Sequence, residues 1–312
     1  MAGIVAALVA PAVAAAGAGG QDATARNGRI VFQAITGTHR QLFAINPDGS
    51  GLRRLTRIAS GPPGKGAGQP DWSPEGSRIA FDAPAGGGTA LFTIRADGTG
   101  MRQVRVAGGG SRAAPVYSPD GRRLAFDHAA SPDSRGISIV AAAGGELRRV
   151  TTGSATPGGS DTAAVWSPDG TRLAFTRTRS AGETAIHVVR ADGAGLRRLT
   201  PWTLAASAAS WSPDGSKILF EIYSTPRPGR SANLFTIAPG GGAMTQLTYF
   251  GGGKTHAFGP AWSPDGAKIV WHKIGPRLDQ LFVMDADGAN HRQLTHLSGS
   301  PRPSHPDWGP GG

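Results

Sequence analysis

The sequence predicts an all-β protein, a six-bladed β-propeller of four-stranded antiparallel blades, and three observations lead to this fold class. A pentapeptide of the form Trp-Ser-Pro-Asp-Gly recurs along the 312 residues at spacings of 45 to 51 residues. A second series of Asp-Gly or Gly-Gly pairs falls between the copies, and the two ends of the chain carry complementary parts of one repeat. This period is that of a propeller blade rather than of a helical repeat.

The pentapeptide is predicted to form the tight turn between the first two strands of each blade. Its Ser can cap the turn, its Pro fixes φ, and its Gly adopts the positive φ that closes the turn. The strand that follows, as in residues 78–81, is apolar on both faces because neighbouring blades are expected to stack on both sides of it. The copies begin at Trp72, Tyr117, Trp166, Trp211 and Trp262, with a degenerate sixth at Trp308.

The third and fourth strands of each blade follow from the second turn series. An apolar run such as residues 90–94 ends in an Asp-Gly or Gly-Gly pair, which is a strong hairpin signal. The next segment reads Leu-Arg-Arg-Leu-Thr or a variant of it, as in residues 52–56. Four strands in each repeat make one propeller blade.

The two ends of the chain predict closure of the ring. Residues 28–32 have the pattern of a second strand with no first strand before it, and residues 305–308 have the pattern of a first strand with nothing after it. Pairing of the C-terminal strand with the N-terminal blade would complete the sixth blade. The expected organisation is therefore a signal-like or flexible leader at 1–26 and a propeller at 27–312.

The leader favours an exported protein in the periplasm, the cell envelope or the medium. Residues 4–16 are apolar and precede Ala16-Gly17-Ala18, a small-residue cleavage pattern. The run is too short to cross a bilayer, so we expect no transmembrane segment in the mature chain. The first basic residue is Arg26, which leaves a flexible alanine-rich leader as the alternative. The lack of cysteine excludes disulfides and thiol catalysis.

The net charge of +11 would suit a nucleic-acid-binding protein, but the positions of the arginines do not. Many of them fall on the outermost predicted strands, where charge opposes edge-to-edge aggregation. They are spread around the rim, and no aromatic ladder accompanies them. We therefore expect a monomer with no nucleic-acid partner. These outer residues are Arg53, Arg54, Arg148, Arg149, Arg197, Arg198 and Arg292.

The repeats between Asn27 and Gly312 resemble the TolB-like propeller family, a WD-repeat-like group, and the resemblance implies a propeller fold. TolB itself carries an additional N-terminal α/β domain that has no counterpart in these residues, so its role in the cell envelope is not carried over. Prolyl oligopeptidases join similar repeats to an α/β-hydrolase domain. The sequence contains no Gly-x-Ser-x-Gly elbow, and we expect no Ser-His-Asp catalysis and assign no catalytic residue.

The longer connections between blades are predicted to gather on one face, here called the loop face, and the tight turns on the opposite turn face. Variable loops on a rigid scaffold often carry binding sites. We therefore expect a non-catalytic module that engages a protein, peptide or glycan at the loop face, and the positive charge there favours an acidic peptide or a polyanionic glycan. The predicted contact residues are Lys65, Arg112, Lys254, His256 and Arg302.

The alternative is a carbohydrate-active lyase or hydrolase with a metal at the central channel. Asp71 and Asp307 occupy equivalent positions before a Trp, where they would hold calcium or another divalent cation, or form local hydrogen bonds. The histidines resemble, in number, the histidine-rich metal centre of oligogalacturonate lyases; those nearest the predicted channel are His256, His272, His296 and His305. Three or more clustered His, Asp or Glu side chains would favour the enzyme, and a mouth lined by Ser, Gly and Ala the binding module.

Overall fold

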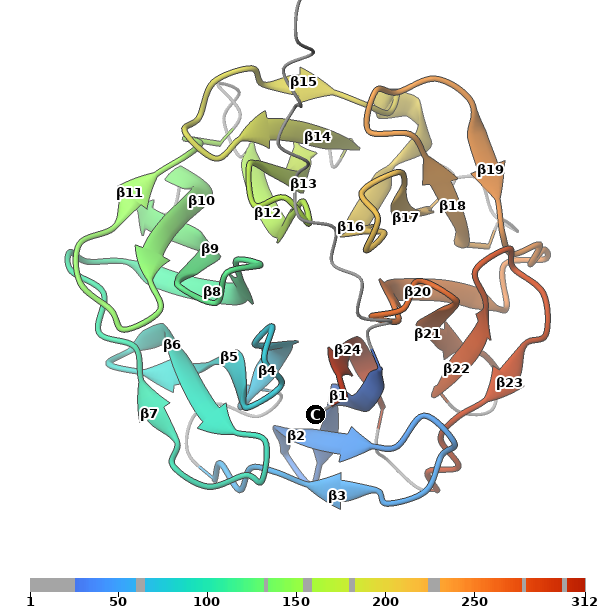
Figure 1. Cartoon of the computed structure of the whole chain (residues 1–312), viewed down its shortest axis with the longest axis horizontal. Coiled ribbons are helices and arrows are strands. Elements are labelled where there is room, and N and C mark those ends of the chain that lie inside the picture. Colours follow the sequence, from blue (N-terminus) through green and yellow to red (C-terminus); the bar gives the residue numbers. More distant parts are fainter. Residues whose placement is uncertain are drawn as a thin grey trace, which may run out of the picture.

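The computed structural model describes residues 26–59, 65–131, 134–153, 159–179, 183–223, 231–276, 279–298 and 302–311. Antiparallel sheets surround a central axis, with β4, β8, β12, β16, β20 and β24 innermost (Figure 1). The predicted leader, apart from Arg26, lies outside the described residues. Within the described part of the chain, no helix is long and apolar enough to span a membrane.

Four of the sheets have four strands each, in an order that matches the predicted repeat. The first sheet contains β24 (Ser304–Pro310), β1 (Asn27–Thr36), β2 (His39–Ile45) and β3 (Arg53–Arg54). The second contains β4 (Gly68–Trp72), β5 (Arg78–Ala85), β6 (Gly88–Arg95) and β7 (Arg102–Gln103).

The other two follow later in the chain, after the short 3-10 helix η2 (Trp202–Leu204). One contains β16 (Ala206–Trp211), β17 (Ile218–Ile222), β18 (Asn233–Ile237) and β19 (Met244–Gln246). The other contains β20 (His256–Trp262), β21 (Lys268–Ile274), β22 (Gln280–Asp285) and β23 (Arg292–Gln293).

The prediction of six four-stranded blades is wrong, because the structure has four such blades and one sheet of eight strands. The long hairpin of β9 and β10 extends far enough to reach the start of β12, where Arg135 pairs in parallel with Ser160 and makes the sheet continuous. This sheet contains β8 (Ser111–Tyr117), β9 (Arg123–Ser131), β10 (Ser134–Ala141), β11 (Arg148–Arg149), β12 (Ser160–Trp166), β13 (Arg172–Thr178), β14 (Thr184–Arg190) and β15 (Arg197–Arg198).

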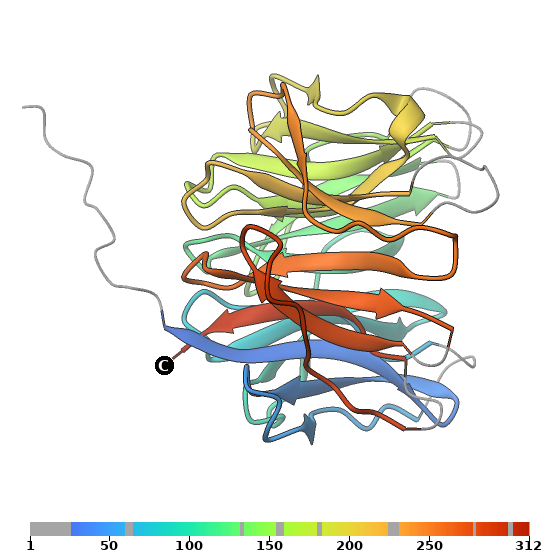
Figure 2. The same cartoon turned by 90° about the vertical axis from the view of Figure 1, so that its right-hand side faces the viewer.

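The predicted pairing of the two chain ends is confirmed. β24 pairs antiparallel with β1, with Ile30 opposite Trp308. The indole nitrogen of Trp308 donates to the carbonyl oxygen of Gly28 at 3.2 Å. β1 begins and β24 ends on the same face of the molecule (Figure 2). The ring is therefore closed by hydrogen bonds between the first and last strands.

The pentapeptide forms the predicted turn. The amide of Gly121 donates to the carbonyl of Ser118 at 2.8 Å, and Gly121 has a φ of +68°. The Ser118 hydroxyl accepts the amide of Arg123 at 3.0 Å and donates to the Asp120 carboxylate at 2.5 Å. Because this side chain satisfies both ends of the turn, the sequence fixes where the second strand begins.

Arginines on four of the outer strands link one repeat to the next. Guanidinium groups donate at 2.5 to 2.7 Å to backbone carbonyl oxygens of the following Asp-Gly or Gly-Gly turn region. The donor and acceptor pairs are Arg53 and Asp97, Arg148 and Ala191, Arg197 and Pro239, and Arg292 and Pro47. These four arginines on the rim thus help to hold neighbouring repeats together.

Candidate functional site

A ring of polar side chains lies near the loop-face end of the channel, and we call it the bulge ring. In each repeat, a polar residue directly follows the buried aromatic residue of the second strand. The innermost strand of the next repeat has a bulge at the same level, and its central residue has a φ between +49° and +54°. The ring members are Gln33, Asp82, Asp127, Thr176, Glu221 and His272, and the bulge residues are Gln69, Ala114, Ala163, Ala208, Gly259 and His305.

Five of the six ring members, all but His272, accept backbone hydrogen bonds that the bulges leave without a strand partner. Asp82 Oδ2 accepts the amide of Ala114 at 3.0 Å, and Asp127 Oδ1 accepts the amide of Ala163 at 2.9 Å. Gln33, Thr176 and Glu221 do the same for Gln69, Ala208 and Gly259 at 2.9, 3.2 and 2.7 Å. A buried amide without a partner would be costly, so these side chains stabilise the inner strands.

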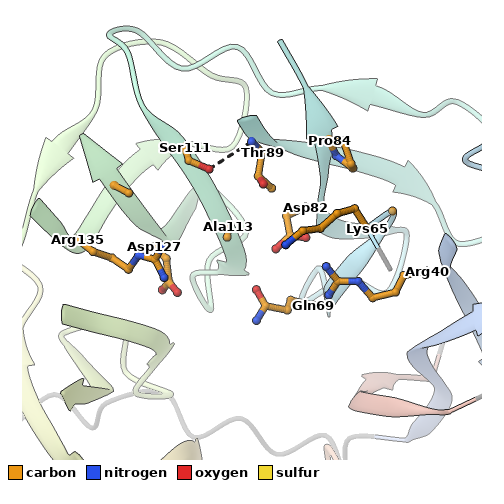
Figure 3. A pocket seen from close by; sticks show the side chains of 12 residues that line it. Arg40, Lys65, Gln69, Asp82, Pro84, Thr89, Ser111, Ala113, Asp127 and Arg135 are labelled. Atoms are coloured by element: carbon orange, nitrogen blue, oxygen red, sulfur yellow. Dashed lines mark hydrogen bonds between the residues drawn. The ribbon is translucent and has the colours of Figure 1, made fainter. Parts of the chain in front are cut away.

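Beside this ring, the loop face is hollowed into a cavity of about 220 Å³, which we call the loop-face pocket. Figure 3 shows five charged side chains gathered around it: Arg40, Lys65, Asp82, Asp127 and Arg135. They come from β2, the segment before β4, β5, β9 and β10. The pocket therefore depends on the packing of three successive repeats and is not formed by one loop.

Backbone contacts fix the positions of the cations on one side of the loop-face pocket. The amide of Arg40 donates to the carbonyl of Lys65, and the amide of Ala67 donates to the carbonyl of Arg40, both at 3.1 Å. A Cβ added to Gly68 would lie 3.0 Å from both Arg40 Nη1 and Asp82 Oδ1. Glycine at this position therefore lets the guanidinium and the carboxylate approach the same point.

Burial governs the charge of Asp82 and Asp127, the two carboxyl groups of the loop-face pocket. Desolvation raises the pKa of Asp82 to about 6, although the amide of Ala114 and the charges of Arg40 and Lys65 act in the opposite direction. Desolvation raises the pKa of Asp127 to about 8, against the amide of Ala163 and the charge of Arg135. Asp127 is therefore mostly uncharged at neutral pH.

The loop-face pocket is consequently positive at neutral pH. Among the described residues, neither carboxylate has an ion pair within 4.0 Å with any of the three cations. In contrast, the guanidinium of Arg177 is already paired with a carboxylate, because it donates two hydrogen bonds of 2.6 and 2.7 Å to Asp161. The site can therefore attract an anion, while its two carboxyl groups and the amide of Gln69 provide neutral or negative acceptors.

The channel carboxylates form inter-blade hydrogen bonds. Asp307 Oδ2 accepts the amide of Trp72, and Asp71 Oδ2 accepts the amide of Tyr117, both at 2.7 Å. Desolvation and the charge of Asp307 raise the pKa of Asp71, and desolvation raises the pKa of Asp307 to about 6. Among the described residues, no group of three His, Asp or Glu could hold a metal ion. Metal binding at this pair stays a prediction.

The structure places the predicted contact residues in different surroundings. Lys65 lines the loop-face pocket, and Arg302 lines a second cavity beside it. Arg112 donates to the carbonyl oxygens of residues 106–110. His256 accepts the amide of Ala232 at 3.1 Å and stacks on aromatic neighbours, while Lys254 is exposed.

Sequence reasoning missed most of the loop-face pocket. It did not identify Arg40, Asp82, Asp127 or Arg135, because these residues belong to strands and the predicted contact residues were taken from the loops. A signal was present, since the runs Ile-Ala-Phe-Asp and Leu-Ala-Phe-Asp each end with a carboxylate directly after a buried aromatic residue. An acid at that position of an otherwise apolar strand requires a hydrogen-bond donor nearby.

Comparison with known proteins gives a family match over most of the chain. The model of the TolB beta propeller domain matches residues 69–312. No curated protein matches the sequence.

Solved structures show the same fold at low identity. A protein assigned as TolB from Agrobacterium tumefaciens is 19% identical, with a TM-score of 0.70 over 90% of this chain and 98% of that chain. TolB from Acinetobacter baumannii is 20% identical, with a TM-score of 0.70 over 90% of this chain and 66% of that chain. An oligogalacturonate lyase in complex with manganese is 14% identical, with a TM-score of 0.56 over 88% of this chain and 75% of that chain.

Proposed function

Because the chain belongs to the TolB beta propeller family, we propose that it is a non-catalytic binding module that engages an acidic peptide segment at the loop-face pocket. The observation that carries the proposal is the convergence of Arg40, Lys65 and Arg135 on one cavity, without ion pairs to the two buried carboxyl groups. Guanidinium and ammonium groups that are not already paired bind carboxylates with charge-assisted hydrogen bonds.

The mixed polarity of the loop-face pocket favours a peptide over a polyanionic glycan. A peptide brings amide donors as well as acidic side chains, and the Gln69 side chain and the carboxyl oxygens of Asp82 and Asp127 can accept them. The channel mouth is lined largely by Ala, Pro, Gly and Ser. Asp71, Asp307 and His305 also line it, but among the described residues no three His, Asp or Glu side chains could hold a metal ion, which supports a binding module over a metal-dependent enzyme.

Export of the protein is part of the proposal. It is supported by the apolar run at residues 4–16 and by the small-residue pattern that follows it. A binding module outside the cytoplasm would meet its partner without competition from nucleic acids, which share the same negative charge.

The test is a titration of a fluorescein-labelled Glu-rich peptide into the protein. We expect Arg135→Gln and Lys65→Gln each to weaken binding by about tenfold, because each removes one unpaired cation from the cavity. The matched control is Arg122→Gln, an exposed cation beside a pentapeptide turn on the opposite face, which should change affinity by less than about twofold.

Three outcomes would contradict the proposal. Equal losses for Arg122→Gln and Arg135→Gln would place the partner on the turn face or make binding nonspecific. Tighter binding of a polyuronate than of the peptide would make the partner a glycan. Turnover of a polysaccharide that a chelator abolishes would assign the protein to the enzyme alternative.

A further inference from the structure

A second cavity of about 230 Å³ lies beside the loop-face pocket, and we call it the carboxylate pocket. It is lined by Gln33, Arg40, His272, Asp279, Arg302 and Ser304. These residues come from the first sheet and from the neighbouring sheet of β20 to β23, so the cavity spans the junction where the ring closes. It shares only Arg40 with the loop-face pocket.

The hydrogen-bond network at the floor of the carboxylate pocket leaves donors unused. Gln33 Oε1 accepts the amide of Gln69, which fixes the orientation of the side-chain amide. Its nitrogen then donates to Ser304 Oγ at 3.0 Å and to His305 Nδ1 at 3.1 Å. Because Ser304 Oγ accepts this bond, its own hydroxyl hydrogen is available to a ligand.

Two further polar atoms of this cavity's lining are buried and have no hydrogen-bond partner among the described residues. These are Nε of Arg40 and Nε2 of His272, and the His272 side chain belongs to a residue that is only 7% exposed. Desolvation and the charge of His305 lower the pKa of His272 to about 4, so its imidazole is neutral at neutral pH. An unpartnered buried donor costs free energy, and an acceptor placed in the cavity would remove that cost.

The charged side chains that line the carboxylate pocket match a ligand that carries one negative charge. Arg40 and Arg302 bring two positive charges and Asp279 brings one negative charge. The nearest approach of Arg302 Nε to Asp279 Oδ2 is 3.8 Å, which is too long for a hydrogen bond, and the Arg302 side chain is 76% exposed. Arg302 is therefore held only loosely and can turn its planar donors toward a ligand.

We propose that this cavity binds one carboxylate group, held by Arg40 and Arg302 with the hydroxyl of Ser304 as a further donor and with Nε2 of His272 as another in its Nε2-protonated tautomer. The carboxylate is a planar monoanion, which fits the paired donors of a guanidinium and the single excess positive charge. A phosphate dianion would leave one charge uncompensated beside Asp279. The carboxylate can belong to a peptide C-terminus or to a sugar acid, and the two sources differ in the groups attached to it.

Calorimetric titrations with small probes test this proposal independently of any binding at the loop-face pocket. The probes are N-acetyl-dialanine as the free acid, the same compound as its C-terminal amide, glucuronate and inorganic phosphate. We expect the free acid to bind at least about tenfold more tightly than the amide, because amidation removes the charge that the guanidinium groups recognise. Glucuronate binding more tightly than the dipeptide acid would identify a sugar acid as the source, and the reverse order a peptide C-terminus; either order supports carboxylate recognition.

Variants separate the two cavities. Arg302→Gln and Ser304→Ala should each weaken binding of the preferred acid by about three- to tenfold, whereas Arg135→Gln, in the loop-face pocket, should leave it within about twofold. A thermal melt of each variant checks that the fold is retained, and Arg302→Gln is exposed enough to leave it unchanged. No binding of either acid, equal binding of acid and amide, or tighter binding of phosphate would overturn the proposal.

Discussion

The bulge ring shows how one backbone requirement is met by different side chains. Five of the six bulges present an amide that a side-chain acceptor satisfies, and the acceptors differ in kind, as Gln33, Asp82, Thr176 and Glu221 show. The choice of acceptor then decides the local charge. Two successive carboxylates next to three cations produce the loop-face pocket, and a neutral His272 beside two arginines produces the carboxylate pocket.

The buried Asp82 is expected to give the protein a distinctive pH dependence of stability. Its pKa in the folded state is raised to about 6, so the folded state favours the protonated form. The resulting stabilisation is complete below the unfolded-state pKa of about 4 and is lost as the pH rises through about 6. Asp82→Asn keeps an acceptor for Ala114 and cannot ionise, so its free energy of unfolding relative to the wild type should rise by about 1–3 kcal/mol between pH 4 and pH 8.

Urea unfolding of both proteins at pH 4 and pH 8 measures this change. Asp120→Asn is the control, because hydrogen bonds from the Ser118 hydroxyl and the Arg122 amide lower the pKa of this turn carboxylate. Its stabilisation is present above the unfolded-state pKa and is lost only as the pH falls below about 4, so the substitution should leave the difference from the wild type nearly the same at pH 4 and pH 8. A difference between Asp82→Asn and wild type that is the same at both pH values would show that the pKa of Asp82 is not raised in the folded protein.

At the scale of the strand, the outer edges of the sheets are notable for their shortness. β3, β7, β11, β15 and β23 each have two residues, so they contribute few backbone hydrogen bonds. Four of the arginines that the sequence predicted as a protection against aggregation also donate to the turn region of the following repeat. This hydrogen bond between an arginine and a backbone carbonyl depends on the distance between neighbouring repeats, and the sequence of one repeat does not determine that distance.

The pair Arg197 and Arg198 separates the two roles of an outer-strand arginine. Arg197 donates to the carbonyl of Pro239 at 2.6 Å, and Arg198 lies over the ring of Trp202 at 5.7 Å. We expect Arg197→Ala to lower the free energy of unfolding by about 1 kcal/mol and Arg198→Ala by less than about 0.5 kcal/mol. Chemical denaturation of both variants gives the comparison. Equal losses would mean that the link to the next sheet contributes nothing beyond a surface charge.

At the scale of the whole molecule, the sequence predicts the structural features that recur from repeat to repeat. It does not predict features that depend on how far one repeat extends toward the next. The Ser118 turn and the pairing of β1 with β24 follow from local patterns and are confirmed. The joining of β10 to β12 rests on one residue pair, Arg135 with Ser160, which depends on how far a hairpin extends in space. The count of six separate blades failed for that reason.

The residues of the candidate site also divide into those that the sequence predicted and those that it did not. Lys65 and Arg302 were predicted because they lie in connections on the loop face, and both line cavities there. Asp127 and Arg135 were not, because a pattern of strands does not tell which polar residue faces a shared cavity. The site combines residues from three successive repeats, and only the three-dimensional arrangement brings them together (Figure 3).

The pH dependence of peptide binding tests the central claim most directly, because it links partner affinity to the charge of the loop-face pocket. Desolvation raises the pKa of Asp127 to about 8, so ionisation above this pH adds a negative charge beside Arg135. The measurement is the affinity for the Glu-rich peptide at pH 7.5, 8.5 and 9.5, where Asp82 with its pKa of about 6 stays ionised, for wild type and Asp127→Asn. Asn keeps an acceptor for the amide of Ala163 and stays neutral throughout. We predict that wild-type affinity falls by about tenfold over this range while the affinity of Asp127→Asn changes by less than about twofold; parallel pH profiles for the two proteins would contradict binding of the peptide at this pocket.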